Sequence, residues 1–211
     1  MMNKKLMAIA SFIDQDDTVL DTCCDHAYLA IYLKKNHLCR DVYASDINPN
    51  ALNVAKKNIE NAKVDITTYL SDGFHNIEND KIDTVVIAGV GTNTVLDILE
   101  GAPKNIRKFI ISSNNHLDIL RKSLYKENLY IQKEIVVFEK QKYYVVMLVT
   151  KDCIKENKFT LKYGKSNNLE YFRHLIKKEE EVLTKIPRNK IFTRHFHKRN
   201  IALLKTFIQK I

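Results

Sequence analysis

The sequence contains few of the residues that mark several common protein classes. Its 211 residues include five glycines, three prolines and four cysteines. The cysteines, at positions 23, 24, 39 and 153, form no disulfide framework and no C-x-x-C pair, so neither a disulfide scaffold nor a zinc site is expected. A reduced cytoplasmic compartment is the simplest inference. No apolar run approaches about 18 residues, so we expect no transmembrane helix.

The sequence also lacks a G-x-G-x-x-G motif after its first predicted strand, which makes a nicotinamide oxidoreductase the least favoured enzyme class. The stretch from Thr18 to Leu29, TVLDTCCDHAYL, instead predicts a buried strand, a tight turn of small residues and a helix. This arrangement holds nucleotide-type ligands through the backbone N–H groups at the helix start. Asp21 and Asp25 flank the turn, and two carboxylates repel a phosphate but attract a cation such as a sulfonium. The stretch therefore favours S-adenosylmethionine over NAD or ATP.

Strand and helix patterns alternate along the first two thirds of the chain. Residues 3–13 have apolar side chains at helical spacing and predict an amphipathic helix rather than a signal peptide. Five strands are predicted, at residues 18–20, 42–44, 65–70, 84–88 and 109–111. Two further β-rich runs, 131–138 and 143–149, predict an antiparallel hairpin. We therefore expect an α/β fold with a Rossmann-like, doubly wound sheet that is mostly parallel and has an antiparallel edge.

Polar side chains gather at the ends of the predicted strands, which share one edge of a parallel sheet. Asp46 is placed to accept both hydroxyls of a ribose, unless it only caps the helix that Pro49 begins. Asp72 can accept a hydrogen bond from an adenine amine beside Gly73, or it can be an ordinary turn residue. Asn114 can both donate to and accept from the edge of a base, with a plain turn as the alternative. Together the strand ends predict a single ligand cradle.

Two further features lie at the same strand ends. Ala88 and Gly89 follow the fourth strand and leave a ligand unobstructed access, although a tight strand-to-helix turn also explains them. His26 follows Asp25 after the first strand, yet a lone histidine is more often structural than catalytic.

The positive charge of the chain is confined to its C-terminal part. The net charge is +9, but residues 1–151 carry 19 basic and 19 acidic groups, whereas residues 152–211 carry 15 and 6. Residues 188–199 include five Lys or Arg and no acid. Apolar spacing after residue 168 predicts two antiparallel helices separated by Pro187. We therefore expect a neutral domain at 1–151 that binds S-adenosylmethionine and a basic helical domain at 152–211 that binds nucleic acid, with a solvated lysine-rich surface as the alternative.

The order of these motifs resembles the TrmK family of bacterial class I methyltransferases, which methylate N1 of adenine 22 in tRNA. The similarity covers residues 4–150 and consists of Asp21-x-x-x-Asp25-His26-Ala27-Tyr28-Leu29, Ile87-Ala88-Gly89-x-Gly91, and Asn114-x-His116 with Arg121 and Leu124 downstream. The family also has a coiled-coil-like C-terminal extension, matching residues 152–211 in kind. Three family strings differ here: Gly-Ser is Cys23-Cys24, Met-Gly-Gly is Val90-Gly91-Thr92, and Gln-Pro-Asn is Ser112-Ser113-Asn114.

The resemblance implies a role for each group of residues. The expected catalytic residues are Asp25, Tyr28 and Asn114. The expected residues for binding S-adenosylmethionine are Asp21, Cys23, His26, Asp46, Ile47, Asp72, Gly73, Ala88 and Gly89. The expected RNA-binding residues are Arg121, Lys122, Arg188, Lys190, Arg194, Lys198 and Arg199. The expected partner is tRNA, with no metal and no membrane, and a monomer is favoured over an oligomer.

Two other functions stay open at this point. Cys23 adds a side chain where the backbone should touch the cofactor, which is compatible with a weak or inactive methyltransferase scaffold that binds RNA. A methyltransferase acting on a small molecule or a protein is disfavoured by the basic C-terminal part.

Overall fold

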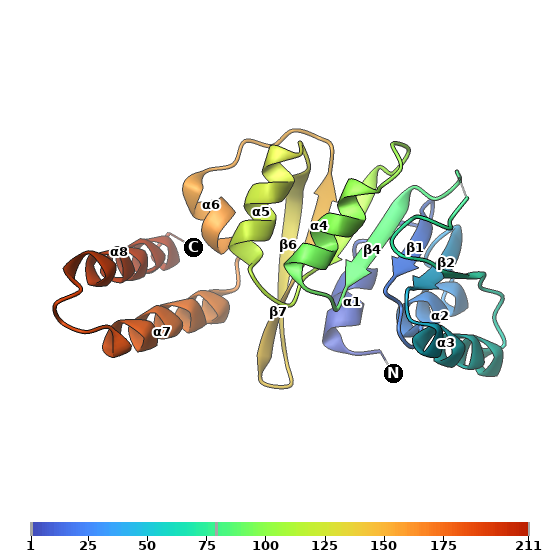
Figure 1. Cartoon of the computed structure of the whole chain (residues 1–211), viewed down its shortest axis with the longest axis horizontal. Coiled ribbons are helices and arrows are strands. Elements are labelled where there is room, and N and C mark those ends of the chain that lie inside the picture. The colour runs from blue at the N-terminus through green and yellow to red at the C-terminus, as the bar shows by residue number, and fades with distance from the viewer. Residues whose placement is uncertain (1, 79, 211) are drawn as a thin grey trace. The chain divides into compact units, whose positions relative to one another are not determined.

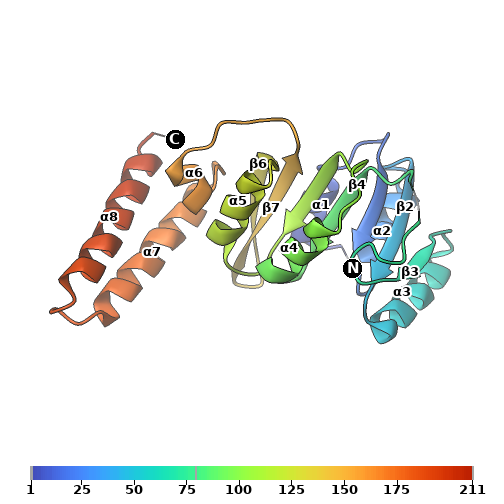
Figure 2. The same ribbon diagram turned by 45° about the horizontal axis from the view of Figure 1, so that its top comes forward.

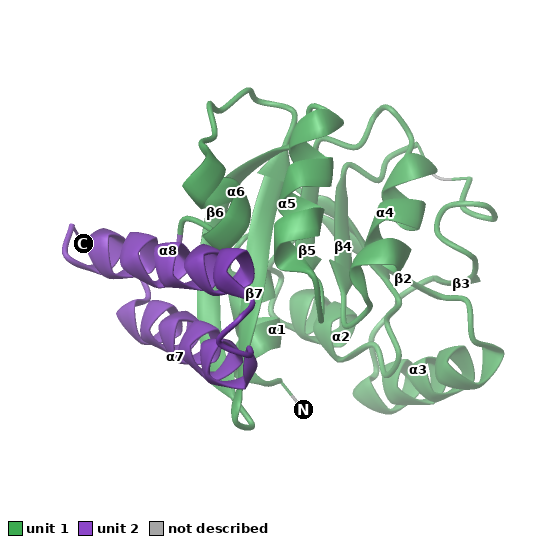
Figure 3. Ribbon diagram, turned by 60° about the vertical axis from the view of Figure 1, so that its left-hand side comes forward, with its two compact units in different colours: residues 1–165 green, residues 166–211 purple. Residues whose placement is uncertain are grey.

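The computed structural model of the chain describes residues 2–78 and 80–210 (Figure 1). Its contacts define two compact units, residues 1–165 and 166–211 (Figure 3). Residues 152–165 belong to the first unit, where the backbone N–H of Lys165 donates to the Glu134 carboxylate at 2.9 Å. The functional boundary expected at residue 151 stays a prediction.

Within the described residues, seven strands form one sheet in the order β3-β2-β1-β4-β5-β7-β6. The strands are β1 (Thr18–Thr22), β2 (Asp41–Asp46), β3 (Thr68–Leu70), β4 (Thr84–Ala88), β5 (Lys108–Ser112), β6 (Tyr130–Glu139) and β7 (Lys142–Thr150). The first five strands pair in parallel, and β7 pairs antiparallel with both β5 and β6. The predicted mostly parallel sheet with an antiparallel edge hairpin is confirmed.

Helices cover both faces of this sheet (Figures 1 and 2). In the first unit they are α1 (Lys4–Ala10), α2 (Tyr28–Lys35), α3 (Pro49–Ala62), α4 (Thr92–Glu100), α5 (Leu117–Lys126) and α6 (Lys158–Tyr163). Ile9 of α1, Leu33 of α2 and Leu52 of α3 share one hydrophobic core with Val86 and Ile110 of the sheet. The helices α4 and α5 pack side by side on the other face. Burial on both faces explains why β4 consists of nearly continuous apolar residues and why all five residues of β1 are buried.

The short helix α6 precedes the two helices that the apolar spacing predicts after residue 168. Asn157 begins it with a capping box, because its side chain accepts from the N–H groups of Phe159 and Thr160 and the Thr160 hydroxyl accepts from the Asn157 N–H. Polar composition hid this helix, since only Tyr163 of α6 is buried.

Arg121 of α5 lies in the protein interior, contrary to its expected contact with RNA. Its side chain is 2% exposed, and its Nε donates to the Glu134 carboxylate of β6 at 2.7 Å. Gly164, at φ +92°, lies against this ion pair, where a Cβ atom would collide with the Glu134 carboxylate. A guanidinium enclosed in this way cannot reach a phosphate, so Arg121 joins α5 to β6 and α6 instead.

The second unit is an antiparallel helical hairpin of α7 (Leu169–Lys185) and α8 (Ile191–Ile208). Phe172 near the start of α7 packs on Phe207 near the end of α8, with ring centroids 4.9 Å apart. Between the helices, Glu179 accepts from His197 at 2.6 Å and from Asn200 at 3.1 Å. No helix in residues 2–78 or 80–210 has the length and apolar character to cross a lipid bilayer.

Candidate active site

A cavity of about 800 Å³ opens at the carboxyl ends of β1, β2 and β4. Its wall includes most of the residues that the sequence assigned to the cofactor or to catalysis. These residues are Asp21, Cys23, Asp25, His26, Tyr28, Asp46, Ile47, Ala88 and Gly89. The parallel topology brings them together, because β2, β1 and β4 are neighbours whose ends point the same way.

Three predicted residues lie beside this cavity rather than in its wall. Asp72 and Gly73 follow β3 and line a smaller cavity of about 290 Å³. Asp72 still lies close enough for its charge to contribute to the raised pKa of Cys23. Asn114 follows β5, and its Nδ2 donates to the Gly89 carbonyl oxygen at 2.6 Å, which fixes the side chain against the cavity wall.

The turn between β1 and α2 has an unusual backbone. Cys23, Asp25 and Ala27 all adopt left-handed conformations, with φ of 54°, 49° and 54°, where glycine is the usual residue. Asp46 holds this turn through its buried carboxylate, which accepts from the Asp25 N–H at 3.0 Å and from the Asn48 N–H at 2.9 Å. The alternative role considered for Asp46, capping the helix that begins at Pro49, belongs instead to Asn48, whose side chain accepts from the N–H of Asn50.

The two cysteines of this turn stay protonated at neutral pH. Burial, followed by the negative charges of Asp46 and Asp21, raises the pKa of Cys23 to about 11. Burial also raises the pKa of Cys24, again assisted by nearby carboxylates. A thiolate nucleophile is therefore absent from this turn, and both side chains act as small apolar groups.

Burial also changes the protonation of Asp21, at the end of β1. Removal from solvent raises the pKa of its carboxyl to about 7, while the N–H of Ala30 and the charge of Lys5 oppose this effect. A cationic ligand beside Asp21 would favour the ionised carboxylate, so ligand binding and proton release from Asp21 are linked.

The raised pKa of Asp21 predicts a loss of stability as the pH rises. In the unfolded chain this carboxyl ionises near its ordinary pKa of 3.8, but in the native state it keeps its proton up to about pH 7. The native state thus binds more protons between these values, and the free energy of unfolding falls across that window. We expect Asp21→Asn to stabilise the fold more at pH 8 than at pH 5, by roughly 2–4 kcal/mol in urea denaturation. An identical effect at both pH values would contradict this assignment.

The helix α1 also contributes to the cavity, although no feature of the sequence predicts this. Asn3, Lys5 and Leu6 line it beside Gly89, as does Lys140 from the turn between β6 and β7. No motif marks Asn3, Lys5 and Leu6, because only the packing of α1 against β6 and β7 brings them to the site.

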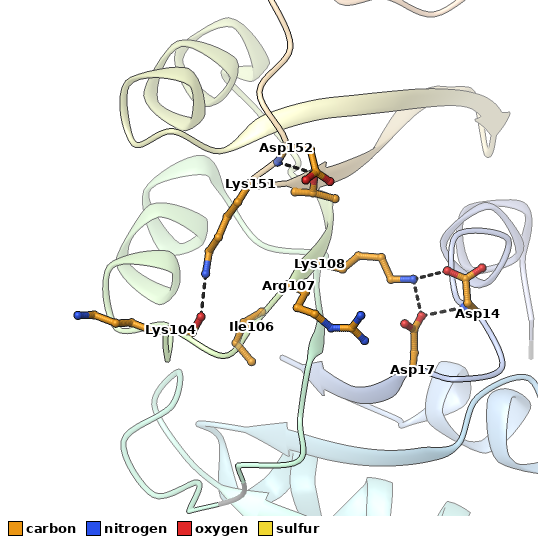
Figure 4. Close-up of a pocket in the computed structure, with 9 residues that line it drawn as sticks. Asp14, Asp17, Lys104, Ile106, Arg107, Lys108, Lys151 and Asp152 are labelled. Atoms are coloured by element: carbon orange, nitrogen blue, oxygen red, sulfur yellow. Dashed lines mark hydrogen bonds and ion pairs between the residues drawn. The ribbon is translucent and has the colours of Figure 1, made fainter.

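A second hollow, of about 530 Å³, lies at the opposite edge of the sheet (Figure 4). Lys108, the first residue of β5, pairs there with Asp14 at 2.7 Å and with Asp17 at 2.5 Å. The Lys151 ammonium donates to the Lys104 carbonyl oxygen at 2.8 Å. Lys108 is therefore paired with two carboxylates in this hollow.

Comparison with known proteins supports a methyltransferase site at the carboxyl ends of the strands. Residues 2–147 match the methyltransferase domain family. The tRNA (adenine(22)-N(1))-methyltransferase of Bacillus subtilis is 28% identical over 152 residues, which are 70% of this chain and 64% of that protein. The alignment thus spans less than two thirds of this relative.

Two solved structures match nearly the whole chain. TrmK of M. capricolum, in complex with S-adenosylhomocysteine, is 29% identical with a TM-score of 0.86, covering 99% of this chain and 98% of that one. A candidate tRNA (m1A22) methyltransferase of Streptococcus pneumoniae, in complex with S-adenosylmethionine, is 26% identical with a TM-score of 0.87, covering 99% and 100%. The fold and the family match define an S-adenosylmethionine-dependent methyltransferase of class I. Within that class, the chain belongs to the TrmK family.

The residues of the cavity fit this cofactor, which supplies a methyl group bound to a positively charged sulfur. The carboxylates of Asp21, Asp25 and Asp46 face one cavity, as a cationic ligand requires. Within residues 2–78 and 80–210, no group of three His, Cys, Asp or Glu side chains could hold a metal ion.

One departure from the TrmK pattern has a structural explanation. Thr92 is buried at the start of α4, and its hydroxyl donates to the Asn115 carbonyl oxygen at 2.7 Å. Its N–H donates to the Asn115 Oδ1 at 3.0 Å. Thr92 therefore ties the end of β4 to the end of β5, and it lies outside the wall of the cavity.

Proposed function

We propose that this methyltransferase transfers a methyl group from S-adenosylmethionine to N1 of adenine 22 in tRNA. The observation that carries the proposal is the group of three carboxylates, Asp21, Asp25 and Asp46, on one cavity of a TrmK-family chain. The named activity of the B. subtilis relative supports the choice of base and position. The basic C-terminal hairpin supports an RNA substrate.

The target adenine is proposed to bind at the mouth of the cavity, between Asp25, Tyr28 and Asn114. The Asp25 side chain is 68% exposed, and Tyr28, which is 40% exposed as a residue, offers an aromatic ring for stacking. Because Asn114 donates its Nδ2 to Gly89, its Oδ1 is left to accept from the exocyclic amine of adenine. Adenine 22 must leave its base stack to reach this position, at a cost of a few kcal/mol.

The proposed reaction needs alignment more than proton removal. The free lone pair of adenine N1 forms the new N–C bond as the S–C bond breaks, and the electron pair of that bond passes to sulfur. The ring then carries a positive charge until its exocyclic amine loses a proton to solvent or to a nearby base. Asp25 is proposed to stabilise this charge, which is the main electrostatic contribution of the site.

The proposed RNA surface lies on the second unit. Its charges come from exposed side chains in the turn between α7 and α8, Arg188 and Lys190, and in the middle of α8, Lys198 and Arg199. Phe192 is 93% exposed among them and can stack on an unpaired base. Arg194 is partly committed to the fold, because its Nη1 donates to the carbonyl oxygens of Leu183 and Ile186 at the end of α7.

Lys122 of the first unit stays a further proposed contact for the phosphate backbone. It pairs with Asp118 at 3.1 Å in an exposed i, i+4 arrangement on α5. Such a pair is weak in water, so a phosphate can displace the carboxylate.

Neutralising two cations of the α8 surface should weaken the salt dependence of tRNA binding. Each lysine or arginine that contacts a phosphate releases counterions, so Lys198→Gln with Arg199→Gln should reduce the slope of log K against log salt by about 2. The control is Lys56→Gln with Lys57→Gln on α3, which changes the total charge equally in an exposed part of the first unit. An equal change in both variants, or none in either, would remove the proposed role of α8.

The proposed activity is tested with an unmodified tRNA transcript and methyl-labelled S-adenosylmethionine. We expect label to enter a transcript with adenine at position 22 and to be absent from the same transcript with guanine there. Mapping the modified base should place the methyl group on N1. Incorporation that ignores position 22 would reject the proposed specificity, and label found only in a protein extract would reject an RNA substrate.

A second function is favoured by one specific observation, the left-handed Cys23 where the TrmK pattern has glycine. If the Cys23 side chain blocks the cofactor, the chain would be a methyltransferase scaffold that binds RNA without catalysis. Cofactor binding by the purified protein separates the two functions.

A further inference from the structure

The hairpin of β6 and β7 extends past the neighbouring strand β5 at the edge of the sheet where the cavity opens (Figure 1). Strand β7 pairs with β5 over residues 147–150, whereas its residues 142–146 have partners in β6. At about 3.4 Å per residue, this overhang is about 17 Å long. The tip of the hairpin therefore projects beyond β5, and its Lys140 lines the cavity.

The two faces of this overhang differ. Val137 and Tyr144 are cross-strand partners on the face that α1 covers, where the Lys5 ammonium lies 5.6 Å from the Tyr144 ring centroid. Because side chains alternate along a strand, the next pair, Phe138 and Tyr143, lies on the opposite face. The ring centroids of that pair are 4.7 Å apart, and Phe138 is 44% exposed. The overhang thus presents an aromatic surface near the cavity.

The turn at the tip has a strained backbone. It consists of Lys140 and Gln141, which have φ of 48° and 62°. A two-residue hairpin turn of this hand usually contains asparagine and glycine, which adopt the left-handed conformation at little cost. Strain of this kind is concentrated at functional sites. The tip therefore carries two long polar side chains where local stability alone would favour small residues.

Exposed lysines flank the aromatic surface at the turn. Lys140 and Lys142 are both exposed, and none of the ion pairs within 4.0 Å among residues 2–78 and 80–210 involves either of them. The adjacent Glu139 carboxylate accepts from the backbone N–H of Lys4 at 3.2 Å. Cations beside an exposed ring fit a strand of RNA, whose phosphates are anionic and whose bases stack.

We propose that the tip of this hairpin, residues 138–143, binds the RNA strand next to the base that enters the cavity. The proposal rests on the proposed tRNA substrate. A base that leaves its stack exposes the face of its neighbour. Phe138 covers that face, and Lys140 and Lys142 contact the adjacent phosphates. The hairpin thereby stabilises the extruded state of the substrate, through a contact that belongs to the first unit.

The role of the ring is tested with two substitutions of Phe138. Phe138→Leu keeps an apolar side chain but removes the ring, so we expect kcat/KM for an unmodified tRNA transcript to fall about tenfold. Phe138→Tyr keeps the ring and should stay within about twofold of the unaltered protein. Calorimetry should show unchanged affinity for S-adenosylhomocysteine in both variants. The control is Val54→Ala, which shortens an exposed apolar side chain of α3 outside the cavity wall and should alter neither quantity.

The role of the lysines is tested separately by Lys140→Gln with Lys142→Gln. We expect this variant to reduce the slope of log K for tRNA against log salt by about 2 and to raise the KM for tRNA. Lys56→Gln with Lys57→Gln is again the matched control, because it removes the same charge from exposed positions of α3.

Unchanged kcat/KM in Phe138→Leu, or an equal loss in Phe138→Tyr, would overturn the stacking contact. If Phe138→Leu also loses affinity for S-adenosylhomocysteine, the lysine variant decides, and an unchanged salt slope there would overturn the proposal. A change in sedimentation of Phe138→Leu with unchanged kcat/KM would show that the tip binds a second copy of the chain instead. If the unaltered protein methylates adenine 22 and the variants match it, only the hairpin contact is rejected. Failure of the unaltered protein to methylate tRNA would reject the RNA substrate and this contact with it.

Discussion

Replacing Asp25 with asparagine should reduce methyl transfer to tRNA about 100-fold or more while leaving cofactor affinity within about threefold of the unaltered protein. Asparagine is the informative substitution because Asp25 has φ of +49°, a conformation that asparagine tolerates and alanine does not. The change therefore removes the negative charge with little effect on the turn. Single-turnover rates with labelled cofactor measure the transfer, and titration with S-adenosylhomocysteine measures the affinity.

Asp65→Asn is a matched control for this variant. Asp65 is an exposed residue between α3 and β3, outside the cavity wall, so its loss should leave transfer unchanged. Retained turnover in Asp25→Asn would refute the role proposed for the carboxylate, whether as counter-charge or as base. A matching loss of cofactor affinity would instead place Asp25 in the cofactor site.

Replacing Asp46 with alanine should have the larger effect on binding. Its two oxygens already accept the N–H groups of Asp25 and Asn48, and the remaining lone pairs are proposed to accept the ribose hydroxyls. We expect affinity for S-adenosylhomocysteine to fall about 100-fold, because a buried site loses both a charged acceptor and the order of the turn. The free energy of unfolding should fall by about 2 kcal/mol, because two N–H groups lose their partner.

The control for Asp46→Ala is the variant Asp41→Ala, at the other end of β2. Asp41 pairs with Lys34 at 2.7 Å and does not line the cavity. Its removal should lower stability modestly without altering cofactor affinity. If Asp46→Ala loses stability but binds S-adenosylhomocysteine as tightly as the unaltered protein, the carboxylate holds only the turn.

Much of the site follows from the sequence, because a parallel sheet places every strand end at the same edge. The residues after β1, β2 and β4 could be grouped once five strands and their connecting helices were recognised. Asp21 and Asp46 are the clearest examples, since each ends a strand and both line the cavity. Asp72 also follows a strand, but grouping by strand ends does not place it correctly in the cavity wall. It lines a separate, smaller cavity at the end of β3.

Other residues took their roles from tertiary packing that no local pattern encodes. Lys5 belongs to a helix that precedes the first strand and reaches the site only by packing against β6 and β7. Arg121 was expected at the surface, where arginine usually lies. It is buried instead, because the Glu134 carboxylate of β6 forms an ion pair with it that offsets the cost of removing its charge from water. The left-handed turn at Cys23 was hidden as well, because glycine is absent from the positions that usually indicate it.

The most direct test of the account is calorimetric titration of the purified chain with S-adenosylhomocysteine. The arrangement of Asp21, Asp46 and Lys5 around one cavity predicts saturable binding of one molecule per chain, abolished or strongly weakened in Asp46→Ala and preserved in Asp41→Ala. Absence of binding by the unaltered protein would contradict the account, because Cys23 would then close the cavity to the cofactor and leave a scaffold without catalysis.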